Sequence, residues 1–181
     1  MTVDLAAASA FMTTHARTLD RRRFELLFGS GDAEGVLAAL DAYRNPDGGY
    51  GWAIEPDLRS PESQPGPSLH AFEAFEDVAP VTSPRAVDLC DWLAAVSLAD
   101  GGLPFALAVT DRAGCAPWWA DADPTVSSLQ ITAVNAAIAA RVARHDPAVA
   151  GHPWLATATD YCLAEIDALD RSCHALVHSF S

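Results

Sequence analysis

Apolar side chains recur every three or four positions along most of the chain, which is the spacing of a helix that buries one face. No segment has the pattern of a convincing strand. After Leu169 the helical pattern is lost. The sequence therefore predicts an all-α fold of roughly seven helices, placed in residues 4–44 (three helices), 69–78, 84–96, 126–142 and 155–169.

Two glycine-rich segments interrupt the helical pattern with related motifs. The third and fourth helices are joined by Asn45-Pro46-Asp47-Gly48-Gly49-Tyr50-Gly51-Trp52, and 53 residues later the fifth helix is followed by Asp100-Gly101-Gly102-Leu103-Pro104-Phe105. Glycine after Asp supplies the positive φ of a tight turn, and the aromatic residue that follows is expected to anchor it. Trp52 is expected to be buried against the flanking helices for this reason.

The helix, glycine loop and helix form a unit that occurs twice, which predicts a stacked helical repeat. With 181 residues, half of them apolar, the chain fits one domain with a substantial core. We expect a single helical-repeat domain over residues 1–181, divided into N-terminal helices (1–44), a first repeat (45–98), a second repeat (99–146) and a C-terminal helix with its tail (147–181).

Charge and composition narrow the classes of partner. The chain has 11 basic residues, all Arg, against 24 acidic residues, and its net charge of -13 repels phosphates and anionic lipids. No apolar run is long enough for a membrane span and no signal peptide is evident, so a cytoplasmic protein without nucleic-acid or membrane partners is expected. The four cysteines lack CxxC spacing and are expected to be reduced and mostly buried: Cys90, Cys115, Cys162 and Cys173.

The glycine loops with their flanking helices resemble the repeat of the terpene-cyclase and protein-prenyltransferase superfamily. The likeness covers residues 45–144 and rests on residues 47–52, on residues 100–102 and on the Trp118-Trp119 pair, without the full Gln-Trp signature. It implies an α/α toroid-like helical repeat of inner and outer helices. Seven helices would make about half a ring, which leaves an apolar edge. Either a second copy covers this edge in a homodimer, or the chain is part of a longer protein, or the half ring is a small arc with a cleft.

The resemblance also implies candidate catalytic residues. Asp121-Ala122-Asp123-Pro124-Thr125 is similar to the acidic motif with which class II terpene cyclases protonate an alkene, an isomerase or lyase chemistry. Carried over by position, Asp123 would be the proton donor and Asp121 its acidic neighbour, whereas Pro124 stands where the family has a further Asp. The alternative is structural, because Asp-Pro before an apolar run is typical of a helix N-cap followed by proline at the first helical position.

A zinc site like that of the prenyltransferases is suggested by Asp88-Leu89-Cys90 together with His152. Cys90 lies on the apolar stripe inside the fifth helix, however, whereas the family places its Asp-x-Cys pair after a glycine loop. A structural thiol is the better interpretation. We expect neither a metal ion nor a cofactor.

The first loop offers a polar group beside Trp52 that could hold a polar head group or a cation: Glu55, Asp57 and Arg59. An ion pair within the loop or simple solvation is the alternative. His70 follows on the next helix, where a partly buried structural histidine is the alternative. Several aromatic residues could line an apolar cavity or simply fill the core, and they include Trp52, Phe72, Phe105, Trp118 and Trp119.

These observations leave two functions open. The first is a terpene-cyclase- or prenyltransferase-like protein that acts on or binds an apolar, isoprenoid-like small molecule in an acid-rimmed cleft. The second is a non-catalytic helical-repeat module that sequesters a ligand or docks a partner. Carboxylates that converge on a closed cavity would favour the enzyme, and acids in solvent around an open groove would favour the binding module.

Overall fold

The computed structural model describes residues 3–179, with side chains described as far as residue 169. Within these residues the fold is all-α and contains no strand, as the sequence predicts. Seven of the helices match the predicted ones, and α6 and α8 are additional four-residue helices that are too short to show a period. The helices are α1 (Leu5–His15), α2 (Thr18–Phe28), α3 (Ala33–Leu40), α4 (Pro65–Asp77), α5 (Pro84–Val96), α6 (Pro117–Ala120), α7 (Leu129–Val142), α8 (Pro147–Ala150) and α9 (Pro153–Ser179).

Three helix boundaries differ from the prediction. Helix α4 begins at Pro65, because prolines fit the first helical turn, where their missing N–H costs no hydrogen bond. Helix α7 begins only at Leu129, where the Ser128 side chain caps it by accepting a hydrogen bond from the Ile131 N–H at 3.3 Å. The backbone of α9 continues to Ser179, beyond the loss of apolar period after Leu169.

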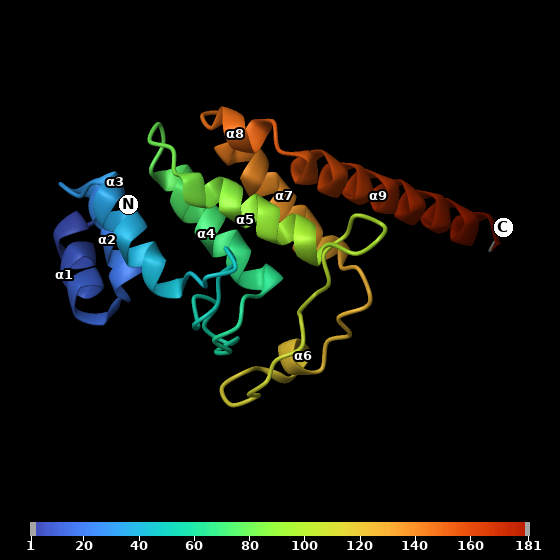
Figure 1. The fold of residues 1–181 in the computed structure, drawn as a ribbon, viewed down its shortest axis with the longest axis horizontal. Coiled ribbons are helices and arrows are strands. Elements are labelled where there is room, and N and C mark those ends of the chain that lie inside the picture. The colour runs from blue at the N-terminus through green and yellow to red at the C-terminus, as the bar shows by residue number, and fades with distance from the viewer. Residues whose placement is uncertain (1–2, 180–181) are drawn as a thin grey trace.

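The longer helices pack as three antiparallel hairpins, which are formed by α2 with α3, α4 with α5, and α7 with α9. Helix α4 contacts α2 on one side and α7 on the other, while α5 contacts α9. Figure 1 shows α1–α3 at one end of the molecule and α9 projecting at the other, with the long loops 44–64 and 97–128 on the same side of the helices. Phe72 lies in the core between these hairpins, fully buried and stacked on Trp154 with ring centroids 6.2 Å apart.

The first glycine loop is closed by one carboxylate. Asp47 Oδ1 accepts hydrogen bonds from the Gly49 N–H at 2.9 Å and from the Ser63 hydroxyl at 2.8 Å, which ties the two ends of the loop together. Gly48 has a φ of 93°, as the turn requires. Gly49 is needed for space instead, since a Cβ there would stand 2.5 Å from Ser63 Cβ and 2.6 Å from the Trp92 ring.

The second glycine loop has the same hydrogen bonds. Asp100 Oδ1 accepts from the Gly102 N–H at 3.0 Å and from the Ser127 hydroxyl at 2.7 Å. Gly101 has a φ of 89°. A Cβ on Gly102 would stand 2.6 Å from Ser127 Cβ and 2.7 Å from the Tyr161 ring. The two loops therefore share a turn, a carboxylate bridge and a glycine packed against a serine and an aromatic ring.

The aromatic anchor of the first loop is Tyr50, and the prediction that Trp52 is buried is wrong. Tyr50 is fully buried, with its ring 6.5 Å from that of Phe75 in an edge-to-face arrangement. Trp52 has a φ of 55° and is 55% exposed, and its indole N–H donates to Asn45 Oδ1 at 2.7 Å. The left-handed backbone turns its ring outward and the bond to Asn45 holds it there.

Gly49→Ala should destabilise the protein by about 1–3 kcal/mol, because the added methyl group overpacks the contact with Ser63 and Trp92. Urea titrations would measure the change in the free energy of unfolding. Gly35→Ala is the matched control, because Gly35 lies within α3 and a Cβ there would meet only Asp32 Oδ1, at 3.2 Å, and more distant atoms of Arg22. The control should be neutral or stabilised by up to about 1 kcal/mol. Equal midpoints for Gly49→Ala and the wild type would contradict the packing argument.

Candidate functional site

An open hollow of about 440 Å³ lies between the second long loop and the start of α7. Two of its apolar side chains are strongly exposed, Trp118 at 60% and Val126 at 59%. We call it the Trp118 hollow, and its lining residues are Phe105, Trp118, Ala122, Asp123, Val126, Ser127 and Ser128. Three sequence-predicted site residues, Phe105, Trp118 and Asp123, therefore meet in one place.

The floor of the Trp118 hollow is held by the first long loop. Phe105 stacks on Trp119 with ring centroids 4.5 Å apart and an interplanar angle of 23°. Trp119 is largely buried, and its indole N–H donates to Asp57 Oδ1 at 2.8 Å. The Asp57 carbonyl also accepts from the Ala116 N–H at 2.7 Å. Trp119 and Asp57, predicted as ligand-binding residues, thus lie behind the hollow and position it.

Two further side chains, neither of them predicted as a site residue, join the long loops. The Gln64 amide is fully buried and pairs with the backbone of Leu107, accepting from its N–H at 2.8 Å and donating to its carbonyl at 3.1 Å. The Glu62 carboxylate accepts hydrogen bonds from the hydroxyls of Ser60 and Thr110. These bonds lower the pKa of Glu62 to about 2. No local pattern indicates either link, because Thr110 and Leu107 are more than forty residues away in sequence.

The acidic motif lies in solvent at the rim of the hollow. Asp123 Oδ1 accepts from the Thr125 hydroxyl at 2.6 Å and from its N–H at 2.8 Å, and these bonds lower the pKa of Asp123 below its ordinary value. This geometry is a turn, so the N-cap prediction for Asp123 is wrong, and α7 begins six residues later. Asp121 is exposed and ion-paired with Arg112. Asp123 is therefore ionised near neutral pH, which is unfavourable for a proton donor.

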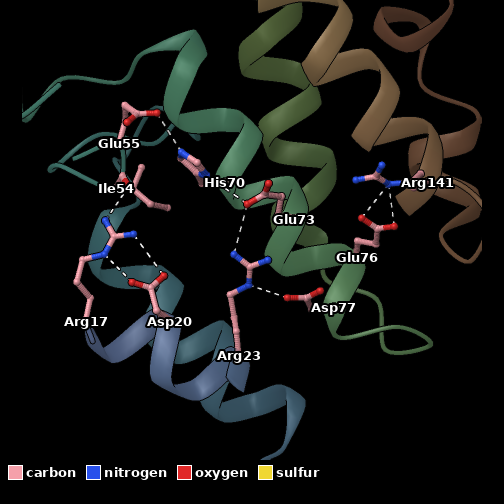
Figure 2. A network of polar contacts seen from close by, with 10 residues as sticks. All are labelled: Arg17, Asp20, Arg23, Ile54, Glu55, His70, Glu73, Glu76, Asp77 and Arg141. Carbon is pink, nitrogen blue, oxygen red and sulfur yellow. Dashed lines mark hydrogen bonds and ion pairs between the residues drawn. The ribbon is translucent and has the colours of Figure 1, made fainter. Parts of the chain in front are cut away.

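A second cluster of predicted residues forms a polar network at α4, shown in Figure 2. The His70 ring lies between two carboxylates, with Nδ1 3.2 Å from Glu73 Oε2 and Nε2 3.1 Å from Glu55 Oε2. The bond to Glu73, together with the weaker effect of Glu55, raises the pKa of His70 above its ordinary value. The His70 bond in turn lowers the pKa of Glu73. His70 thus connects Glu55 of the first long loop to Glu73 of α4.

The same network reaches α2 through arginines. Arg23 donates from Nε to Asp77 at 2.6 Å and lies 3.4 Å from Glu73. Arg17 pairs with Asp20 at 2.8 Å and donates to the Ile54 carbonyl, also at 2.8 Å. Figure 2 shows these side chains meeting between α2, α4 and the first loop. Their partners are all within the protein, which favours a structural role for the network.

Arg59 is separate from both clusters. The expected alternative of an ion pair within the first loop is wrong, because Glu55 binds His70 and Asp57 binds Trp119. Arg59 is exposed, and its aliphatic carbons lie against Gly114, where a Cβ would be 2.9 Å from Arg59 Cδ.

The residues with zinc-like spacing are occupied by other contacts. Asp88 pairs with Arg44 at 2.7 Å, and His152 lies 3.1 Å from Asp91. Cys90 is fully buried, and burial raises the pKa of its thiol to about 12, so that it is a neutral core side chain. Cys162 is also buried and Cys115 half-buried, all three being free thiols, while the side chain of Cys173 lies outside the described residues.

Comparisons with known proteins identify no relative of this chain. No family model, no curated protein and no solved structure matches the chain. Among the helices of residues 3–179, none is both long and apolar enough to cross a membrane.

The His70 network should make stability depend on pH. The raised pKa of His70 means that its contribution is complete below about pH 6.5 and is lost as the pH rises through the folded-state value. The lowered pKa of Glu73 means that its contribution is complete above about pH 4.5 and is lost as the pH falls through its folded-state value. The pair is therefore most stabilising between these two limits.

His70→Gln should lower the free energy of unfolding by about 1 kcal/mol near pH 5.5 and by much less near pH 9. Urea titrations of both proteins at the two pH values would measure this difference. His145→Gln is the control, because His145 has no ion pair among the described residues and should show no such trend. A difference for His70→Gln that stays constant with pH would exclude the protonated bridge.

Proposed function

We propose that the protein is a non-catalytic helical-repeat module that binds an apolar, isoprenoid-like small molecule in the Trp118 hollow. The observation that carries this proposal is the exposure of Trp118 and Val126 on the wall of a preformed hollow. Large apolar side chains left in solvent around a concavity mark binding sites, because a ligand that covers them is driven in by the hydrophobic effect.

Acid catalysis is the weaker alternative. A donor that protonates a carbon–carbon double bond must hold its proton in a site closed to water. Asp123 is instead exposed and its pKa is lowered by Thr125, and Asp121 is bound to Arg112 in solvent. The binding module needs neither residue to carry a proton.

The arrangement of hairpins supports an α/α toroid-like repeat of about half a ring. In this proposal α4 and α7 are neighbouring inner helices, and α5 and α9 are the corresponding outer helices. The contacts of α4 with α7 and of α5 with α9 fit that assignment, as do the matching hydrogen bonds of the two glycine loops. Both loops then lie at the same end of the units, where the second loop lines the Trp118 hollow and the first loop supports it.

Trp118→Ala should weaken the binding of farnesol about tenfold or more, since covering a large aromatic side chain contributes about 1.5–3 kcal/mol. Isothermal titration calorimetry would measure the affinity. Trp52→Ala is the matched control, because Trp52 is similarly exposed, at 55%, but lies outside the hollow. Equal affinities for Trp118→Ala and the wild type, or no binding of farnesol to the wild type, would exclude this site.

A half-ring also leaves an edge that a second copy would cover. Helix α9 has an exposed apolar stripe beyond its contacts with α5 and α7, formed by Leu163 at 58%, Ile166 at 51% and Leu169 at 57% exposure. We propose that a second copy of the chain packs on this stripe to form a homodimer.

Sedimentation of the wild type at micromolar concentration should give a mass above that of the 19.1 kDa monomer. Ile166→Glu should shift the protein towards the monomer, because it places a charge within the apolar contact. Val81→Glu changes an exposed apolar residue in the turn between α4 and α5 and should leave association unchanged. A wild type that remains monomeric throughout would contradict the dimer.

A further inference from the structure

We propose that the ligand of the Trp118 hollow is an amphiphilic cation, an ammonium group on an apolar body, with the ammonium bound by Asp123 and Trp118. This inference rests on the proposed binding function and adds the charge class of the ligand. Asp123 is the one charged residue among those that line the hollow, and it is an anion.

The Asp123 carboxylate has one oxygen available to a ligand. Its Oδ1 is occupied by the N–H and the hydroxyl of Thr125, and its Oδ2 has no hydrogen-bond partner among the described residues. The bonds to Oδ1 fix the orientation of the carboxylate and keep it ionised by lowering its pKa. A charge that is already oriented is ready to bind an ammonium group without first breaking an internal ion pair.

Trp118 and Asp123 line the same hollow, and in this proposal both contact one head group. The exposed indole presents a ring face that attracts a cation, and Trp is the most favourable residue for this interaction. Phe105 and Val126 supply the apolar wall for the remainder of the ligand. The lining therefore combines an aromatic face, an ionised carboxylate and an apolar surface.

An anionic head group meets no counter-charge at this site. The lining contains no Arg or His, and the nearby Arg112 is already bound to Asp121 and to the Ala120 carbonyl. A prenyl phosphate would thus face Asp123 without compensation, whereas an amine on the same chain would be attracted to it.

Three probes with the same isoprenoid chain separate these cases: farnesylamine as the cation, farnesol as the neutral reference and farnesyl phosphate as the anion. We expect the wild type to bind farnesylamine about tenfold more tightly than farnesol, the size of one charge-assisted contact, and farnesyl phosphate more weakly than farnesol. Calorimetric titrations below the concentrations at which these compounds aggregate would measure the three affinities. Raising the salt concentration should reduce the preference for the amine.

Asp123→Asn should abolish most of the preference for the amine over farnesol, because Asn can still accept from Thr125 but carries no charge. Asp111→Asn is the matched control. Asp111 lies exposed in the same long loop, accepts from the Ala113 N–H at 2.9 Å in the same kind of turn, and does not line the hollow. Asp111→Asn removes the same net charge as Asp123→Asn but does so outside the hollow, so this control should leave the preference for the amine intact.

Equal affinities of the wild type for farnesylamine and farnesol would overturn the inference while the binding function stands. The inference would also be overturned if Asp123→Asn retained the preference for the amine, or if Asp111→Asn abolished that preference equally. Either result would assign the preference to the overall charge of the chain. Failure of farnesol to bind the wild type would overturn the proposed function and, with it, the inference that rests on it.

Discussion

The close approach of a glycine backbone to a serine side chain, at the base of each glycine loop, is the contact on which the positions of both long loops depend. Gly49 packs against Ser63 and Gly102 against Ser127, at distances that leave no room for a Cβ. A carboxylate then joins each serine to its glycine by hydrogen bonds. Because each serine lies just before the next helix of a hairpin, this contact holds the start of that helix against the loop.

The Trp118 hollow follows from this arrangement because the two long loops support each other. The first loop supplies Asp57 to the Trp119 indole and Gln64 to the backbone of Leu107. Trp119 then stacks beneath Phe105 and leaves the neighbouring Trp118 in solvent. The hollow therefore belongs to a segment held by partly buried polar contacts, which is why an exposed indole can be presented at a defined place.

The sequence predicts the features of this protein that depend on neighbours along the chain. Apolar spacing located the seven longer helices, and the Asp-Gly-Gly motif indicated the turns at Gly48 and Gly101, because periodicity and positive φ are local properties. The position of Trp52 depends on a hydrogen bond to Asn45 and on its own left-handed backbone, which the motif does not reveal. The N-cap prediction for Asp123 is wrong because Ser128, rather than the Asp-Pro pair, caps the start of α7.

For the candidate site, the sequence indicates which residues are candidates more readily than it indicates the structural role of each. Phe105, Trp118 and Asp123 line one hollow, as candidate site residues would. Asp57 and Trp119 instead hydrogen-bond to each other behind that hollow. His70 lies between the carboxylates of Glu73 and Glu55. Aromatic and acidic residues suit a terpene cyclase and a cation-binding site equally, so composition cannot separate the two functions. The exposure of Asp123 favours the cation-binding proposal, because a carboxylate in solvent is an ion at neutral pH and attracts cations, whereas a proton donor requires enclosure.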